Sequence, residues 1–194
     1  MALTHVNVDI ETLGVTPDSV VLSLALIPFT FEEKCTYDDL ISRGFYIKFN
    51  PIEQIKVGRI TDYDTIQWWN RQNDEAKLII KPSVNDVSVT EGLILLNDFI
   101  KSSKYDYKES YSWSRGQDFD FPIIMHLYRQ FKIKYPLNSW KHRDIRTYID
   151  ILSGSKNGYF EMNDIDHSKI IKHNALSDTA MDIIRMKKLY DSLI

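Results

Sequence analysis

The stretch HVNVDIET, residues 5–12, alternates β-branched aliphatic side chains with polar ones. Because successive side chains of a strand point to opposite faces of a sheet, this alternation predicts a strand whose aliphatic face enters a core. Asp9 and Glu11 then project side by side from the other face. Two neighbouring carboxylates repel each other and raise each other's pKa unless a cation lies between them. The pair therefore indicates a metal site on the first strand.

The bulk composition is typical of one globular domain, which we expect to span residues 1–194. The chain is 43% hydrophobic and has a formal net charge of -3, so contact with a polyanion must be local rather than spread over a basic surface. Cys35 is the single cysteine, which excludes an internal disulfide and fits a reducing cytoplasm. No stretch approaches the roughly 18 apolar residues of a membrane span. We therefore expect a cytoplasmic protein that does not contact membranes.

Hydrophobic periodicity predicts a mixed α/β domain around the first strand. The further predicted strands are 19–29, 44–50, 110–116 and a short one near 141–145. The predicted helices are 64–80, 88–102, 118–131, one through 147–152, and 177–194. Since Asp is favoured at helix N-caps, helix 118–131 is expected to begin on Asp118 or Asp120.

Other candidate residues each have an ordinary structural explanation beside the functional one. Asp120 is suited to cap a helix, and Asp178 to balance the dipole in the first turn of the last helix. His173 taken alone is more often a structural histidine than a catalyst. Trp68 and Trp69 lie about 100° apart on a helix, so both cannot face the core equally. Periodicity favours Trp69 for the core, which leaves Trp68 free to stack on a terminal base.

Three motifs together resemble those of the DEDDh exonucleases of the ribonuclease H-like superfamily. They are VDIET (8–12), FD (119–120) and HNALSD (173–178). Within that class the chain is most similar to phage exonuclease A and related bacterial 3′–5′ exoribonuclease-like domains. The further matching stretches, which cover nearly the whole chain, are IQWWNRQNDEA (66–76), WSRGQDFD (113–120) and HRDIRT (142–147). The resemblance implies a ribonuclease H-like α/β fold, with a central mixed sheet and helices on both faces.

The resemblance also implies a role for each candidate. Asp9, Glu11 and Asp178 would hold the metal ion that activates water, and Asp9 with Asp120 would hold the ion nearest the leaving 3′-oxygen. His173 would be the general base. Oxygen ligands without a cysteine cluster favour Mg²⁺ or Mn²⁺, and phosphodiester hydrolysis suits two such ions.

The motif alignment favours Asp120 over Asp118 as the ligand. The family pattern is a Trp-Gly-Asn-Gly-like stretch, then two variable residues, then Phe-Asp, and the Phe-Asp pair falls on residues 119–120. Two departures are visible. Ser114 and Arg115 replace the usual Gly-Asn, and Asp182 replaces a frequent Gln. We expect Arg115 either to contact phosphate or to balance the local acidity.

The substrate-binding candidates are Thr12 and Leu13, where relatives contact the terminal nucleotide, together with Trp68. The predicted activity is a metal-dependent 3′–5′ exonuclease that releases nucleoside 5′-monophosphates from single-stranded ends, with DNA favoured. Alternatives are an exoribonuclease of the same family and a non-catalytic nucleic-acid-binding domain of the same fold. A Ser/His/Asp hydrolase is disfavoured because no G-x-S-x-G elbow occurs. The resemblance leaves a homodimer open and implies the host cytoplasm if the chain is phage-encoded.

Overall fold

The computed structural model describes residues 3–160, 162 and 170–193. Within these residues the chain forms a five-stranded sheet in the order β3-β2-β1-β4-β5. The strands are β1 (His5–Thr12), β2 (Val21–Phe29), β3 (Phe45–Lys48), β4 (Ser112–Ser114) and β5 (His142–Asp144). β1 pairs antiparallel with β2 and parallel with β4, so the sheet is mixed, as the resemblance implies.

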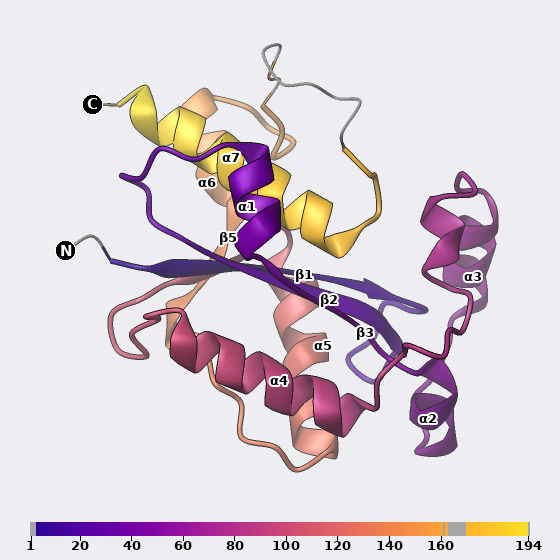
Figure 1. Ribbon diagram of the computed structural model, residues 1–194. Helices are drawn as coiled ribbons and strands as arrows, with labels where there is room; N and C mark the ends of the chain where they lie inside the picture. The colour runs from indigo at the N-terminus through magenta and orange to yellow at the C-terminus, as the bar shows by residue number, and fades with distance from the viewer. Residues whose placement is uncertain (1–2, 161, 163–169, 194) are drawn as a thin grey trace.

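Helices cover both faces of this sheet (Figure 1). α4 (Val89–Ser102) and α5 (Gln117–Gln130) lie on one face. α1 (Tyr37–Arg43), α6 (Ile145–Ser153) and α7 (Ala175–Asp191) lie on the other. The remaining short elements are α2 (Pro51–Lys56), α3 (Tyr63–Asn70) and two 3₁₀ turns, Ala76–Leu78 and Ser139–Lys141. Among the described residues, no helix has both the length and the apolar character of a bilayer-spanning segment.

The two faces of β1 meet different layers. Val6, Val8 and Ile10 are buried in a core that they share with side chains of α4 and α5. Asn7 points to the opposite face, where its side-chain amide donates to the backbone oxygen of Thr179 in α7 (3.0 Å). Because side chains alternate along a strand, Asp9 and Glu11 share the face of Asn7. The predicted alternation is confirmed, and it directs both carboxylates toward α7.

The predicted helix 64–80 is wrong as a single element. α3 ends at Asn70, and a separate 3₁₀ turn follows at Ala76–Leu78. The Asn73 side chain accepts a hydrogen bond from the Ala76 amide (2.8 Å), which offers the backbone an alternative to continued helix. Trp69 and Ala76 still pack into one apolar cluster, so the predicted core position of Trp69 is confirmed although the helix is broken.

Local caps set three boundaries that periodicity missed. α1 was not predicted, although Thr36 and Asp39 form a capping box at its start. α2 was also not predicted, although Asn50 caps it and Pro51 occupies its first position. The last helix begins at Ala175 rather than at residue 177, because the Asn174 side chain accepts from the Ser177 amide (3.1 Å).

Candidate active site

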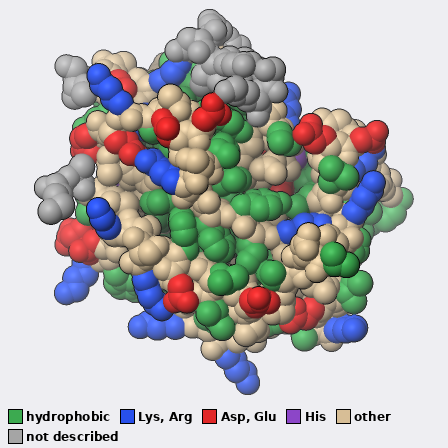
Figure 2. Space-filling view, viewed as in Figure 1, with side chains coloured by type: hydrophobic (Ala, Val, Ile, Leu, Met, Phe, Trp, Pro, Cys, Tyr) green, Lys and Arg blue, Asp and Glu red, His purple; other side chains and the backbone are tan. Residues whose placement is uncertain are grey.

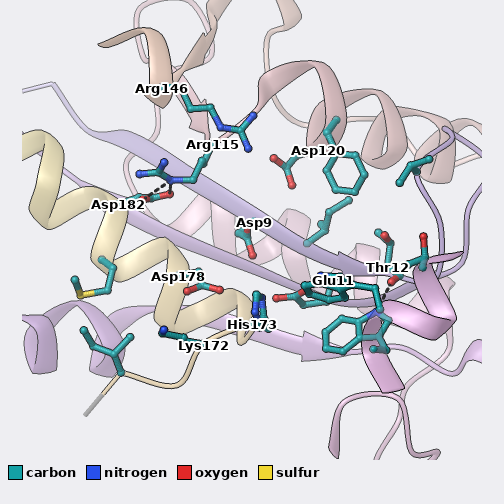
Figure 3. Close-up of a pocket in the computed structure, with 18 of the residues that line it drawn as sticks. Asp9, Glu11, Thr12, Arg115, Asp120, Arg146, Lys172, His173, Asp178 and Asp182 are labelled. Atoms are coloured by element: carbon teal, nitrogen blue, oxygen red, sulfur yellow. Dashed lines mark hydrogen bonds and ion pairs between the residues drawn. The ribbon is translucent and has the colours of Figure 1, made fainter. Parts of the chain in front are cut away.

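A cavity of about 1200 Å³ opens at the carboxyl end of β1. The residues singled out in the sequence that line it are Asp9, Glu11, Thr12, Trp68, Trp69, Arg115, Asp120, His173, Asp178 and Asp182. They come from β1, α3, α5, α7 and the segments just before these last two helices, which are far apart in the sequence (Figure 3). On the face shown in Figure 2, Lys and Arg are dispersed among Asp and Glu rather than gathered in one basic area. A polyanionic ligand would therefore depend on the cavity more than on this face.

Three carboxylates in the cavity can share one cation. Single oxygens of Asp9, Glu11 and Asp178 all lie within 4.8 Å of one another. Asp120 lies near Asp9 on the side of the cavity that α5 forms (Figure 3). It is only 2% exposed, and its Oδ2 has no hydrogen-bond partner among the described residues. Hard oxygen ligands of this kind fit a divalent cation, and the unpartnered oxygen leaves Asp120 available to one.

The electrostatics of the cluster also call for a cation. Burial, reinforced by the charges of Asp178 and Asp120, raises the pKa of Glu11 to about 8. Burial raises the pKa of Asp120 to about 8, and burial with the charge of Asp182 raises that of Asp178 to about 7. The pKa of Asp9 is raised well above its usual range by burial and then by Asp120 and Glu11. A bound divalent cation would relieve this repulsion and keep all four groups ionised.

These pKa shifts predict how the stability of the metal-free protein depends on pH. Carboxyl groups of the unfolded chain have a pKa of about 4, whereas the pKa of Glu11 and of Asp120 in the folded protein is about 8. The native state therefore binds more protons at neutral pH, and the free energy of unfolding should fall as the pH rises from about 6.5 to 8.5. Burial lowers the pKa of His5 and of His142 to about 4. These two groups make the free energy of unfolding rise with pH, but only below a pH of about 6.5, so they do not affect this range.

Thermal unfolding in EDTA should thus show a melting temperature that decreases across this pH range. Saturating Mn²⁺ should flatten the dependence, because the bound cation keeps the carboxylates ionised in the fold. Asp120→Asn should reduce the slope in EDTA, whereas the exposed Asp118→Asn should leave it as in the wild type. A melting temperature that is constant or rises in EDTA would contradict the assigned pKa directions.

The start of α5 differs from the predicted cap. Neither Asp118 nor Asp120 caps the helix, so that prediction is wrong. The helix begins after Gly116, whose φ of 102° lies in the left-handed region. Glycine adopts this conformation without strain because it has no Cβ. Asp144 supplies the acceptor instead, because its Oδ2 receives hydrogen bonds from the amides of Gly116 (3.0 Å) and Gln117 (3.3 Å). Asp120 is thereby free to face the cavity, while Asp118 is exposed and does not line it.

His173 lies before the helix that carries Asp178, as the spacing of the motif required. Its φ of 59° places it in the left-handed region, and Asn174 then caps α7. The imidazole packs edge-on against Trp68, with 4.7 Å between ring centroids. Burial, with the charge of Lys172 acting in the same direction, lowers the pKa of His173 below its usual range. The ring is therefore neutral near neutral pH.

The two tryptophans divide as predicted. Trp69 is 1% exposed, and its Nε1 donates to the backbone oxygen of Thr12 (2.8 Å). Trp68 is 36% exposed and lines the cavity. Leu13 does not line the cavity, since its side chain packs with Leu22 and Trp69. Its role in nucleotide binding stays a prediction without direct geometric support.

An ion-pair cluster borders the cavity beyond Asp120. Arg115 Nε donates to both carboxylate oxygens of Asp182 (2.9 and 3.1 Å), and Arg185 Nη1 donates to the same group (2.8 Å). Of the two expectations for Arg115, balancing the local acidity is the one that these contacts support. Asp144 and Arg146 were not among the predicted site residues, although both lie in the HRDIRT stretch (142–147) that resembles the family.

The fold and the acidic cavity define the class of protein. The nuclease domain of 3′hExo, a DEDDh family member solved bound to rAMP, matches 98% of this chain and 93% of its own, with a TM-score of 0.67 and 12% identity. The zinc-bound complex of E. coli ExoI with ssDNA matches 98% of this chain and 42% of its own, with a TM-score of 0.63 and 12% identity. The chain thus has the ribonuclease H-like fold of DEDDh exonucleases, as the sequence implied.

The family follows from sequence. The model of the 3′–5′ exoribonuclease Rv2179c-like domain matches residues 4–188. The exodeoxyribonuclease of Enterobacteria phage T4 is 34% identical over an alignment 208 residues long, gaps included, which covers 93% of this chain and 86% of that protein. This chain therefore belongs to the Rv2179c-like family and is a 3′–5′ exonuclease.

Proposed function

We propose that this chain releases nucleoside 5′-monophosphates from the 3′ ends of single-stranded DNA in a reaction that requires two divalent ions. The observation that carries the proposal is the approach of the Asp9, Glu11 and Asp178 carboxylates within 4.8 Å at one cavity. DNA is favoured because the phage T4 relative is named an exodeoxyribonuclease. An RNA substrate is the second candidate, since the family description names an exoribonuclease.

Mg²⁺ or Mn²⁺ suits the all-oxygen ligand set. Asp9, Glu11 and Asp178 would hold one ion, and Asp9 with Asp120 would hold the other. When bound, two such ions orient the phosphate and stabilise charge on the entering and leaving oxygens. The buried Asp120 Oδ2 has no hydrogen-bond partner among the described residues, which supports the place of Asp120 in this set.

The chain's own side chains bind the terminal nucleotide and move one proton. Trp68 offers a partly exposed ring on which any base can stack. Thr12, buried beside Glu11, borders the same region. His173 takes the proton from the attacking water, for which its lowered pKa keeps the imidazole neutral. The predictions of one domain over residues 1–194, a cytoplasmic location and a homodimer stay open.

The direct test uses 5′-labelled single-stranded DNA and RNA of one sequence, incubated with purified protein and Mg²⁺. We expect the labelled strand to shorten stepwise from its 3′ end, with DNA degraded faster than RNA. Dialysis against EDTA should abolish the ladder, and added Mn²⁺ should restore it. Full hydrolysis in excess EDTA would contradict metal dependence, and faster degradation of RNA would establish the second candidate.

A further inference from the structure

Arg146 lies at the second position of α6 and lines the cavity. It is exposed, and no described residue accepts a hydrogen bond from its guanidinium or forms an ion pair with it. Arg115 and Arg185, which border the same cavity, are instead both bonded to Asp182. Arg115 and Arg185 each keep one buried nitrogen without a hydrogen-bond partner among the described residues, but their charges already face the Asp182 carboxylate. The charge of Arg146 faces no such partner in the described part of the chain and is available to an anionic ligand.

The arginine lies in a slot between two glycines. A Cβ on Gly116 would lie 3.0 Å from Arg146 Nη1, and a Cβ on Gly158 would lie 2.5 Å from the Cβ and Cγ of Arg146. Both glycines also have left-handed φ values, 102° and 66°. Any side chain at either position would push the arginine away. The two glycines therefore leave space for the Arg146 side chain both at its base and at its guanidinium.

Asp144 holds the walls of the slot together. Its Oδ2 accepts from the Gly116 amide (3.0 Å), and its Oδ1 accepts from the Thr147 amide (2.7 Å). One carboxylate thereby connects the start of α5, which carries Asp120, to the start of α6, which carries Arg146. Packing against the two glycines therefore positions the Arg146 side chain, and Asp144 fixes the backbone on both sides of it.

The location of the slot indicates which part of a nucleic acid would reach it. In Figure 3, Arg146 and Asp120 lie at one end of the cavity, and His173 and Thr12 lie at the other. Trp68 contacts His173, so the aromatic surface belongs to that second end. If the terminal base stacks there, as the proposed function requires, the preceding part of the strand leaves past Asp120 toward Arg146.

We propose that Arg146 binds the phosphodiester immediately 5′ to the scissile bond. The inference rests on the proposed function. A guanidinium has paired donors that match two phosphate oxygens, and its charge cannot be lost at any relevant pH. An acidic protein would thereby hold a polyanion at a point outside the carboxylate cluster.

The test neutralises one linkage at a time. In a single-stranded oligonucleotide, a methylphosphonate replaces the phosphodiester directly 5′ to the terminal linkage, and kcat/KM is measured for the first cleavage with Mg²⁺. The wild-type enzyme should lose about 10-fold on this substrate, as expected for one charge-assisted contact. Arg146→Gln should be about 10-fold slower than wild type on the unmodified strand and should lose nothing further from the methylphosphonate.

Arg143→Gln is the matched control, because it removes the same charge from a guanidinium that lies 4.3 Å over the Tyr111 ring and outside the cavity. It should behave as the wild type on both substrates. Additive losses in Arg146→Gln, an unchanged rate on the unmodified strand, or a larger effect from the next linkage upstream would overturn the inference. A wild-type enzyme that releases no monophosphate from either strand would instead refute the proposed function, and this inference with it.

Discussion

Replacing Asp120 with asparagine is expected to lower kcat by about 10³-fold or more while the fold is kept. Asp120 is 2% exposed and offers the proposed second ion an oxygen to which no residue in the described part of the chain donates a hydrogen bond. An amide has no charge with which to hold that cation, and the ion's contribution to the transition state is worth several kcal/mol. The measurement is single-turnover release of the terminal nucleotide from labelled DNA with saturating Mg²⁺.

The same variant should be more stable than the wild type in EDTA. Burial raises the pKa of Asp120 to about 8, so the ionised carboxylate destabilises the metal-free fold near that pH. Asparagine removes the charge at nearly constant shape, and its melting temperature should rise in EDTA at a pH of about 8.5. A variant that loses activity because it unfolds would show the opposite shift, which separates the two causes of inactivity.

Asp118→Asn is the control for the choice between two neighbouring acids. Asp118 lies two residues away in the first turn of the same helix, but it is exposed and does not line the cavity. Its replacement should leave kcat nearly unchanged. An inactive Asp118→Asn together with an active Asp120→Asn would show that the motif alignment was misread.

His173→Ala should lower kcat by about 100-fold or more, in keeping with the usual contribution of a general base. The wild-type rate at saturating Mg²⁺ should rise with pH as the imidazole loses its proton. Because burial and the charge of Lys172 lower the pKa of His173, the midpoint of this rise should lie at a pH below 6.5, the ordinary pKa of histidine. The variant should lose that limb of the pH profile while its affinity for DNA changes little, since Trp68 still offers its ring.

His126→Ala provides the matched control. His126 lies on α5 with its Nδ1 3.2 Å from Arg59 Nη1, and it does not line the cavity. Its replacement should keep the wild-type pH profile. Wild-type turnover and an unmoved pH limb in His173→Ala would remove His173 from the mechanism and leave the proton to another acceptor.

Local patterns in the sequence predicted much of the fold. The alternation of residues 5–12 indicated a strand with one apolar face and Asp9 and Glu11 together on the other, and the buried Val6, Val8 and Ile10 confirm the apolar face. Periodicity likewise separated Trp69 from Trp68. Such predictions succeed because a strand or helix repeats its direction every few residues, so the face on which a side chain lies follows from spacing.

Short caps and polar breaks were harder to predict. Asn73 ends the run that periodicity extended from 64 to 80, because its side chain competes for the Ala76 amide. Asn50 and Pro51 begin a helix that the preceding strand pattern obscured. In each case a single side-chain hydrogen bond or ring decided the boundary, and an average over many residues does not detect a single bond.

The sequence by itself determined the residue types of the site and the face on which Asp9 and Glu11 lie. Only the tertiary structure decided that Asp144 rather than Asp120 receives the first amides of α5, and that Gly116 and Gly158 leave a slot for Arg146. These contacts join segments whose proximity depends on the parallel pairing of β4 and β5. Spacing along the chain carries no information about such through-space contacts, because they depend on how separate elements pack, whereas the faces of a strand depend only on its own backbone.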